Sequence, residues 1–352
     1  MLHTKQVLDK ITGSINRRAD PGQLYEVYRL FNGFYEGYPG LVLDRFKSTV
    51  VISNHLQPGA INPILSPLQD WLLNHIKGLD GILLKQRQHF NDRMRQGVMI
   101  HGKALPDRIS EFGVIYALDL QLNQDASFYL DTRNLRRWLL ENMAGLKVFN
   151  TFAYTGSLGV AAGAGGASHV VQTDLNQGFL KLSQRSWELN HLLPKKMSIL
   201  TGDFFRVAGR IRHEDHLFDC VILDPPFFSI TDKGRVDLQG ETPRLINKVR
   251  PLVAHQGYLI VINNALFYPG KSFMGELDAL CQSDYLSFVK KIDIPEDVTG
   301  YPETITESPP CDPSPFNHPT KIAILKVLRK DQRDSTFFTQ DERTSSGMGL
   351  MP

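Results

Sequence analysis

From residue 147 onward, short apolar runs alternate with helical segments, and this alternation constrains the fold more than any other feature. Strands are predicted over 148–151, 169–173, 197–200, 219–223, 258–262 and 321–327. Helices are predicted over 157–164 and 176–190, the second with Phe179, Leu182 and Leu189 on one apolar face. Short apolar strands separated by helices indicate βαβ units and a mostly parallel sheet that is covered on both faces.

The chain changes in character near residue 105. Before that point we expect strands over 40–44, 48–53 and 81–85 and a helix over 66–76, with Ser66 as its cap and Pro67 in its first position. We therefore divide the chain into a smaller N-terminal α+β domain (1–105), a Rossmann-like α/β domain (106–330) and a polar tail (331–352) that we expect to be disordered.

Composition narrows the class of protein without naming a partner. The net charge is +2, which neither requires nor excludes a nucleic acid. No apolar run reaches the ~18–20 residues that span a bilayer, and residues 1–20 resemble an amphipathic helix more than a signal peptide. Three widely spaced cysteines form neither a disulfide framework nor a zinc motif, so we expect a cytoplasmic location and no metal.

The residues that directly follow each strand are the candidate site, because such sheets bind ligands at the carboxyl ends of their strands. The first strand leads into Asn150-Thr-Phe-Ala-Tyr-Thr-Gly-Ser157, where Gly156 allows a tight turn close to a ligand. The turn lacks the GxGxxG pattern of dinucleotide sites. Taken alone, it is also what an ordinary turn from strand to helix looks like.

Carboxylates follow the next strands. Asp174 is placed to accept hydrogen bonds from the hydroxyls of a ribose, and its alternative role is to cap the following helix. Asp203 could accept from an adenine amino group, with Phe204 packed on the ring, or could likewise cap a helix. The fourth strand ends in Asp224-Pro-Pro-Phe227. The co-occurrence of these four strand ends is more specific than any one of them.

Together these strand ends resemble a class I S-adenosylmethionine (SAM) dependent methyltransferase, and more closely the bacterial 23S rRNA methyltransferases related to the large-subunit cytosine-5 enzyme. Residues 26–33, 37–45 and 127–136 are also similar to segments of that family. The resemblance implies SAM as the cofactor and RNA, usually rRNA, as the substrate. The cofactor-binding residues that it implies are Asp131, Arg133, Asn150, Phe152, Tyr154, Gly156, Ser157, Asp174, Asp203, Phe204 and Asp224.

The sequence departs from that family in two ways. Longer family members begin with a PUA RNA-binding domain, and we expect none ahead of Glu26. Cytosine-5 methyltransferases also need a cysteine nucleophile after the fifth strand, where this chain has Asn263 and Asn264. Cys311 lies in a loop near the expected site and its role stays open, while the other two cysteines are expected to be inert. The methylated atom therefore stays open.

Asp224, Pro225 and Phe227 are the predicted catalytic residues. Their motif resembles the Asp/Asn-Pro-Pro-Tyr/Phe of amino methyltransferases, where the acid or amide and a proline carbonyl accept the hydrogens of an exocyclic amine. Proline fixes the turn and donates no hydrogen bond. An aromatic side chain stacked on a base contributes ~1–3 kcal/mol. The alternative interpretation is a strand that ends in a Pro-Pro turn beside two core phenylalanines.

A weaker prediction concerns RNA. Lys85, Arg87, Arg93 and Arg95 interleave with a histidine and a phenylalanine, a pattern that can follow a phosphate backbone or simply be a solvated surface. RNA is the expected partner, a membrane is not, and a homodimer is one assembly that we keep open. Two other function classes stay open as well. One is a nicotinamide-dependent oxidoreductase, and the other is a non-catalytic RNA-binding relative.

Overall fold

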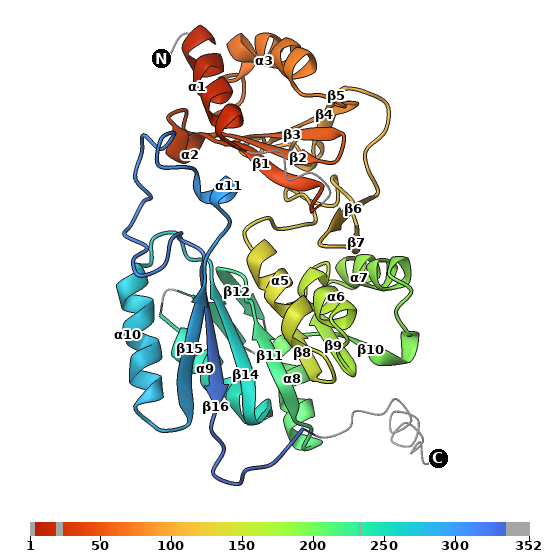
Figure 1. The fold of residues 1–352 in the computed structure, drawn as a ribbon, viewed down its shortest axis with the longest axis vertical. Coiled ribbons are helices and arrows are strands. Elements are labelled where there is room, and N and C mark those ends of the chain that lie inside the picture. Colours follow the sequence, from red (N-terminus) through yellow and green to blue (C-terminus); the bar gives the residue numbers. More distant parts are fainter. Residues whose placement is uncertain (1–3, 19–23, 232–233, 239, 336–352) are drawn as a thin grey trace.

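The computed structural model describes residues 4–18, 24–231, 234–238 and 240–335 in two α/β units (Figure 1). The larger unit holds a seven-stranded sheet in the order β10-β9-β8-β11-β14-β16-β15. Its strands are β8 (Lys147–Thr151), β9 (His169–Asp174), β10 (Met197–Thr201), β11 (Phe218–Leu223), β14 (Val253–Asn263), β15 (Leu286–Ile292) and β16 (Lys321–Val327). Neighbours from β10 to β14 pair in parallel, and β16 is antiparallel to both of its neighbours. This is the doubly wound sheet that the alternating pattern predicts.

Helices cover both faces of this sheet. One face packs against α5 (Arg133–Asn142), α6 (Ser157–Ala164) and α7 (Gln177–Leu189), and the other against α8 (Phe204–His213), α9 (Thr242–Val249) and α10 (Gly270–Cys281). Successive strand residues alternate between the two cores, because Val148 belongs to the first and Phe149 to the second. Helices α6 and α7 approach closely, since a side chain at Gly163 would lie 2.3 Å from the ring of Trp187.

The smaller unit is a five-stranded sheet in chain order. Its strands are β1 (Val27–Asn32), β2 (Leu41–Phe46), β3 (Thr49–Asn54), β4 (Gly81–Gln86) and β5 (Val98–His101). Helices α1 (Thr4–Arg17) and α3 (Asn62–His75) pack on one face. On the other face, Val27, Phe46 and Leu83 join the same apolar core as helices α5 to α7. The two units therefore share a continuous core.

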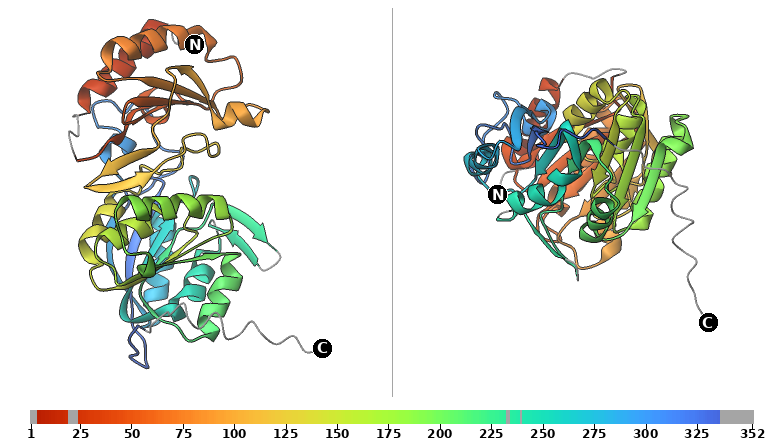
Figure 2. Two further views of the ribbon diagram at one scale, coloured as in Figure 1. Left: turned by 90° about the vertical axis from the view of Figure 1, so that its right-hand side faces the viewer. Right: turned by 90° about the horizontal axis from the view of Figure 1, so that it is seen from below.

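Two short helices and two hairpins lie outside these two sheets. They are α2 (Gly33–Glu36), α4 (Asp92–Gln96), the hairpin of β6 (Arg108–Glu111) and β7 (Val114–Ala117), and the hairpin of β12 (Phe228–Thr231) and β13 (Gly234–Asp237). The first hairpin lies between the two units, and the second projects from the larger one (Figure 2). The chain also returns to the smaller unit late, because α11 (Glu296–Thr299) packs against β1.

The predicted start of the 66–76 helix is wrong. Helix α3 begins at Asn62, so Ser66 does not cap it and Pro67 lies inside it. Pro63 occupies the first turn instead, where a missing N–H removes no helical hydrogen bond. The first-turn proline is thus Pro63 and not the predicted Pro67.

The buried face of the 176–190 helix is not the predicted apolar face, whose residues Phe179, Leu182 and Leu189 are half-buried. Helix α7 buries Leu180, Ser183, Ser186 and Trp187. Two serines on the buried face made it look polar in the sequence. The Ser186 hydroxyl donates to the backbone oxygen of Leu182 and accepts from the amide of Ala117, so its burial leaves no unpaired group.

Residues 331–335 of the predicted tail make contacts in the structure. Arg333 pairs with both oxygens of Asp215, and the Ser335 hydroxyl donates to Asp219 at 3.0 Å. Residues 336–352 lie outside the described residues. Across the described part of the chain, no helix combines the length and the apolar character that crossing a bilayer requires.

A buried group of four charged side chains joins the two units, and we call it the joint cluster (Arg133, Arg136, Glu111 and Asp297). Arg133 donates to the two oxygens of Asp297 at 2.7 and 3.1 Å and to the backbone oxygen of Val27 at 2.8 Å. Arg136, one turn further along α5, donates to the two oxygens of Glu111 at 2.6 and 2.9 Å. None of the four side chains is more than 9% exposed.

Replacing Arg133 with alanine should lower the free energy of unfolding by about 3–5 kcal/mol, because Asp297 would stay buried without its partner. Urea unfolding followed by circular dichroism measures the change. Arg137→Ala is the matched control on the same helix, since the Arg137–Glu141 pair is exposed and is worth less than about 1 kcal/mol. Equal effects of the two substitutions would contradict the role of the joint cluster.

Candidate active site

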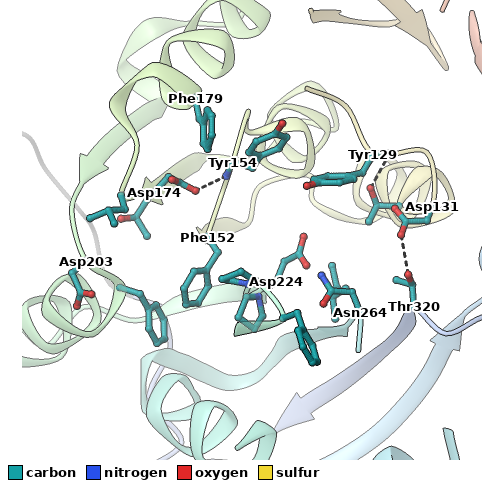
Figure 3. A pocket seen from close by; sticks show the side chains of 18 of the residues that line it. Tyr129, Asp131, Phe152, Tyr154, Asp174, Phe179, Asp203, Asp224, Asn264 and Thr320 are labelled. Carbon is teal, nitrogen blue, oxygen red and sulfur yellow. Dashed lines mark hydrogen bonds between the residues drawn. The ribbon is translucent and has the colours of Figure 1, made fainter. Parts of the chain in front are cut away.

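A cavity of about 810 Å³ opens at the carboxyl ends of the parallel strands (Figure 3). It lies where the strand order reverses between β8 and β11, the place where doubly wound sheets bind ligands. Its volume is typical of small-molecule sites. The predicted site residues that line it are Asp131, Phe152, Tyr154, Asp174, Asp203, Phe204, Asp224, Pro225 and Phe227. The structure therefore brings together most of the residues selected at the strand ends.

Arg133, Asn150, Gly156 and Ser157 were predicted in the same site but are not among the residues that line the cavity. Arg133 is turned into the joint cluster, and Asn150 is buried in β8 with its amide bonded to the neighbouring strand β9. Gly156 precedes α6 with φ at 78°, and a side chain there would lie 2.2 Å from the Ser183 hydroxyl. These residues pack in the interior next to the elements that line the cavity and do not face the cavity themselves.

The four predicted RNA contacts are in different surroundings. Lys85 is 1% exposed and donates to two backbone oxygens at 2.9 Å, so its predicted contact with RNA is wrong. Burial lowers the pKa of Lys85 to about 8. Arg87 lines the cavity and pairs with Asp125 at 2.9 Å. Arg95 donates to a backbone oxygen at 2.8 Å, and Arg93 is exposed on α4.

Asp174 ties two strand ends together. One of its oxygens accepts from the amide of Tyr154 at 2.8 Å and the other from the amide of Asn176 at 2.9 Å. Asn176, rather than Asp174, is the cap of α7. Tyr154 and Phe152 both have φ at 51°, a backbone conformation that costs free energy in residues other than glycine. The carboxylate thus helps to hold a strained loop at the cavity wall, and burial raises the pKa of Asp174.

Asp203 combines two placements that the sequence offered as alternatives. It caps α8 by accepting from the amide of Arg206 at 3.2 Å, and it also lines the cavity. The next residue, Phe204, packs its ring 4.5 Å from that of Phe152, measured between ring centres. The two rings form an apolar section of wall between the ends of β8 and β10.

Asp224 lies in the cavity with a second carboxyl group nearby. Burial raises the pKa of Asp224 to about 7, and the charge of Asp131 acts in the same direction. Asp131 accepts from the hydroxyl of Thr320 at 2.9 Å, and burial raises its pKa as well. Asn264 is also directed into the cavity, and its buried Oδ1 has no hydrogen-bond partner among the described residues (Figure 3).

Sequence reasoning missed several lining residues, including Tyr129, Phe179, Asn264, Phe267 and Thr320. Asn264 follows the fifth strand, so the rule used for the other strand ends would have found it. Thr320 precedes β16, whose antiparallel direction brings its start to the same edge. Phe179 was assigned to a buried helix face. Phe267 is 65% exposed at the rim and has no local signal in the sequence.

No cysteine lines the cavity. Cys220 is buried in β11, where burial raises the pKa of its thiol. Cys311 donates to the backbone oxygen of Leu266, which is itself a lining residue, at 3.1 Å. Among the described residues, no three His, Cys, Asp or Glu side chains gather closely enough to hold a metal ion.

Residues 86–304, more than half of the chain, match the family model of S-adenosylmethionine-dependent methyltransferases. The chain belongs to this family. SAM is therefore its cofactor, and the predicted methyltransferase activity and class I fold are confirmed. The matched residues include the strand ends from β8 to β14 that form the cavity. Membership in this family excludes the alternative of a nicotinamide-dependent oxidoreductase.

Two relatives in sequence are named as enzymes of ribosomal RNA. The chain is 26% identical over 314 residues to YwbD of Bacillus subtilis, a candidate ribosomal RNA large subunit methyltransferase, with 84% of this chain and 77% of YwbD covered. It is 34% identical over 200 residues to the ribosomal RNA large subunit methyltransferase K of Neisseria meningitidis. That match covers 56% of this chain and 54% of the K enzyme, so the chain spans about half of that relative.

A solved structure is similar over both units. It is that of SMU.776, a candidate methyltransferase in complex with SAH, with a TM-score of 0.80 and 22% sequence identity. The match covers 93% of this chain and 82% of the other. At this identity the likeness shows the fold, and it includes the smaller unit as well as the methyltransferase sheet.

The raised pKa of Asp224 predicts a stability that depends on pH. The folded protein holds the Asp224 proton more tightly than the unfolded chain does, so between about pH 4 and pH 7 a rise in pH lowers the free energy of unfolding. Asp224→Asn removes this dependence. The melting temperature of the variant minus that of the wild type should therefore increase by about 3 °C over this interval, as differential scanning calorimetry measures. A constant difference would contradict the environment assigned to Asp224.

Proposed function

We propose that this protein transfers the methyl group of SAM to a base of RNA, with large-subunit ribosomal RNA as the substrate. The observation that carries the proposal is the position of Asp224-Pro-Pro-Phe227 at the end of β11, inside the cavity at the switch point. Phe227 is 46% exposed, so a base that leaves its stack can rest against the ring. The names of YwbD and the K enzyme support RNA as the substrate.

The residues of the cavity fit SAM, which supplies a methyl group already activated on a sulfonium. Asp174 uses one acceptor site on each oxygen for backbone amides, and an ionised carboxylate has about four such sites. The remaining sites can accept from ribose hydroxyls. Asp203 and Phe204 suit the adenine, with an acceptor beside an aromatic face. Asp131 suits the ammonium group of the cofactor, because its carboxyl group lines the same cavity.

We assign Asp224 a positioning role on the substrate. Methyl transfer from a sulfonium depends on alignment and electrostatics more than on proton transfer. The oxygens of Asp224 can accept from the hydrogens of a base amine, and the carbonyl of Pro225 lies in a turn that proline keeps rigid. The side chain of Asn264 lines the same cavity beside this motif.

For the methylated atom, we favour a base amine over C5 of cytosine. The C5 reaction needs a thiolate that bonds to C6 before C5 can accept the methyl group. The strand-five position that holds this cysteine in the cytosine-5 enzymes is Asn263-Asn264 here. Asn263 is buried and donates to the backbone oxygen of Leu238 at 3.0 Å, which suits a structural role.

We also propose the division of the chain at residue 105, with the N-terminal unit taking part in RNA binding in the cytoplasm. Arg93 is exposed on α4, and the nearby ring of Phe90 is 87% exposed. An exposed cation and an exposed ring together suit a single-stranded segment. The cysteines are all free, as expected in a reducing compartment.

Asp174→Ala should weaken SAH binding about tenfold or more, because a hydrogen bond from a ribose hydroxyl to a charged carboxylate is lost. Isothermal titration calorimetry measures the affinity. Asp70→Ala, an exposed substitution on α3, is the control and should bind SAH like the wild type. Unchanged affinity of the Asp174 variant would remove the ribose assignment.

Phe227→Ala should raise the KM for RNA about tenfold, since a base loses its stacking partner, while SAH affinity stays unchanged. Phe227→Tyr keeps the ring and should retain most of the activity, and Phe288→Ala, which removes an exposed ring away from the cavity, should leave the KM unchanged. The substrate itself is identified by mass spectrometry of rRNA nucleosides from a strain that lacks the gene. A full set of rRNA methylations in that strain, or stabilisation of the protein by NAD and not by SAM, would reject the proposed function.

A further inference from the structure

A second hollow, of about 600 Å³, runs between helices α8 and α9 next to the cofactor cavity. We call it the basic groove, and it is lined by Phe205, Arg206, Arg212, Arg244, Asn247 and Lys248. Phe205 lines both the groove and the cofactor cavity. A ligand in the groove would therefore be continuous with a substrate that enters the cavity. Both helices pack on the same face of the sheet (Figure 1).

The charged residues of the two helices are all basic. Helix α8 has the sequence FFRVAGRIRH and α9 has TPRLINKV, so together they hold five Lys or Arg residues and no Asp or Glu. The whole chain, by contrast, balances 39 basic against 37 acidic residues. Such a local concentration of positive charge is the electrostatic feature by which proteins attract phosphate backbones.

Among the carboxylates near the groove, Glu241 is paired with one of the lining cations. Glu241 pairs with Arg244 at 2.7 Å, and Glu214 lies 3.5 Å from Arg210, which is outside the groove. Asp203 accepts from the backbone at the start of α8. Arg206, Arg212 and Lys248 line the groove, and their side chains form no ion pair with a carboxylate among the described residues. Their charge is thus available to an external anion.

Arg244 adds an aromatic partner to this charge. Its guanidinium lies 5.7 Å from the centre of the Phe205 ring, at the junction of the groove and the cofactor cavity. Lys248 is one turn further along α9, so both side chains lie on the same side of the helix. An aromatic face at the cavity end, followed by a row of cations, suits a nucleotide strand whose base is in the cavity and whose phosphates follow the helices.

We propose that the basic groove binds the sugar-phosphate backbone of the RNA strand that flanks the target base. The inference rests on the proposed function and deepens it, because it assigns the path by which the strand leaves the cavity. An extended polyanion suits the groove better than a compact anion does, since the cations are spread along two helices. Each phosphate that the groove neutralises releases counterions, so binding must weaken with salt.

The test uses the full chain and a short, fluorescein-labelled single-stranded RNA of mixed sequence. Fluorescence anisotropy gives the dissociation constant over a series of salt concentrations. The triple variant Arg206→Ala/Arg212→Ala/Lys248→Ala should reduce the slope of log affinity against log salt by about 2, because each lost phosphate contact contributes about 0.7. The control triple variant Lys5→Ala/Lys181→Ala/Lys195→Ala has the same change in charge at exposed lysines elsewhere and should keep the wild-type slope.

The outcomes separate this proposal from the proposed function. Both triple variants should bind SAH like the wild type, which shows that the cofactor cavity is intact. Equal slopes for the two triple variants would reject the groove as the RNA path while leaving RNA methylation standing. Failure of the wild type to bind RNA would reject both proposals. Stabilisation of the wild type by inorganic phosphate that the groove variant loses, with no change in the RNA slope, would make the groove a site for small anions and reject the RNA path.

Discussion

The joint cluster is the interaction on which the rest of the structure depends. Burying charged groups is costly, and a buried pair is stable only when its geometry is close and its hydrogen bonds are complete. Arg133 meets most of this condition by donating to Asp297 and to β1, which belongs to the smaller unit, while its Nε lies 3.6 Å from Glu111 without a hydrogen bond among the described residues. Apolar contacts around it would tolerate small shifts, whereas paired charges do not. The cluster therefore fixes how the two units meet.

The same cluster reaches the cavity through Arg136. Arg136 donates to the backbone oxygen of Tyr129 and to the hydroxyl of Thr132, both lining residues, at 2.8 and 2.7 Å. The segment that holds Asp131 is thus held between the cluster and Thr320. Positioning of this kind matters for methyl transfer, where alignment contributes more than acid–base chemistry. The cavity wall is rigid because its supports are buried.

Features that depend on neighbouring residues in the sequence could be predicted, whereas contacts between residues far apart in the sequence could not. Six of the seven strands of the larger sheet, and residues at strand ends such as Asp174 and Asp224, depend on local pattern and were predicted, whereas β15 was not. The partner of Arg133 lies 164 residues away, and that of Asp131 lies 189 residues away, so no local pattern could indicate them. The predicted RNA contact of Lys85 was wrong for a related reason. In the sequence, a buried lysine that bonds to distant carbonyl oxygens cannot be told from an exposed lysine.

The late return of the chain to the smaller unit has a mechanical consequence. Domains that are joined by one linker can rotate about it, and such motion is the usual expectation. Here the polypeptide passes to the larger unit near residue 105, returns to the smaller unit at α11, which packs on β1, and crosses again to the larger unit before β16. Three crossings and a shared core leave no single linker about which the units could rotate. The protein should therefore meet its substrate as a rigid body, and any bending on binding must come from the RNA.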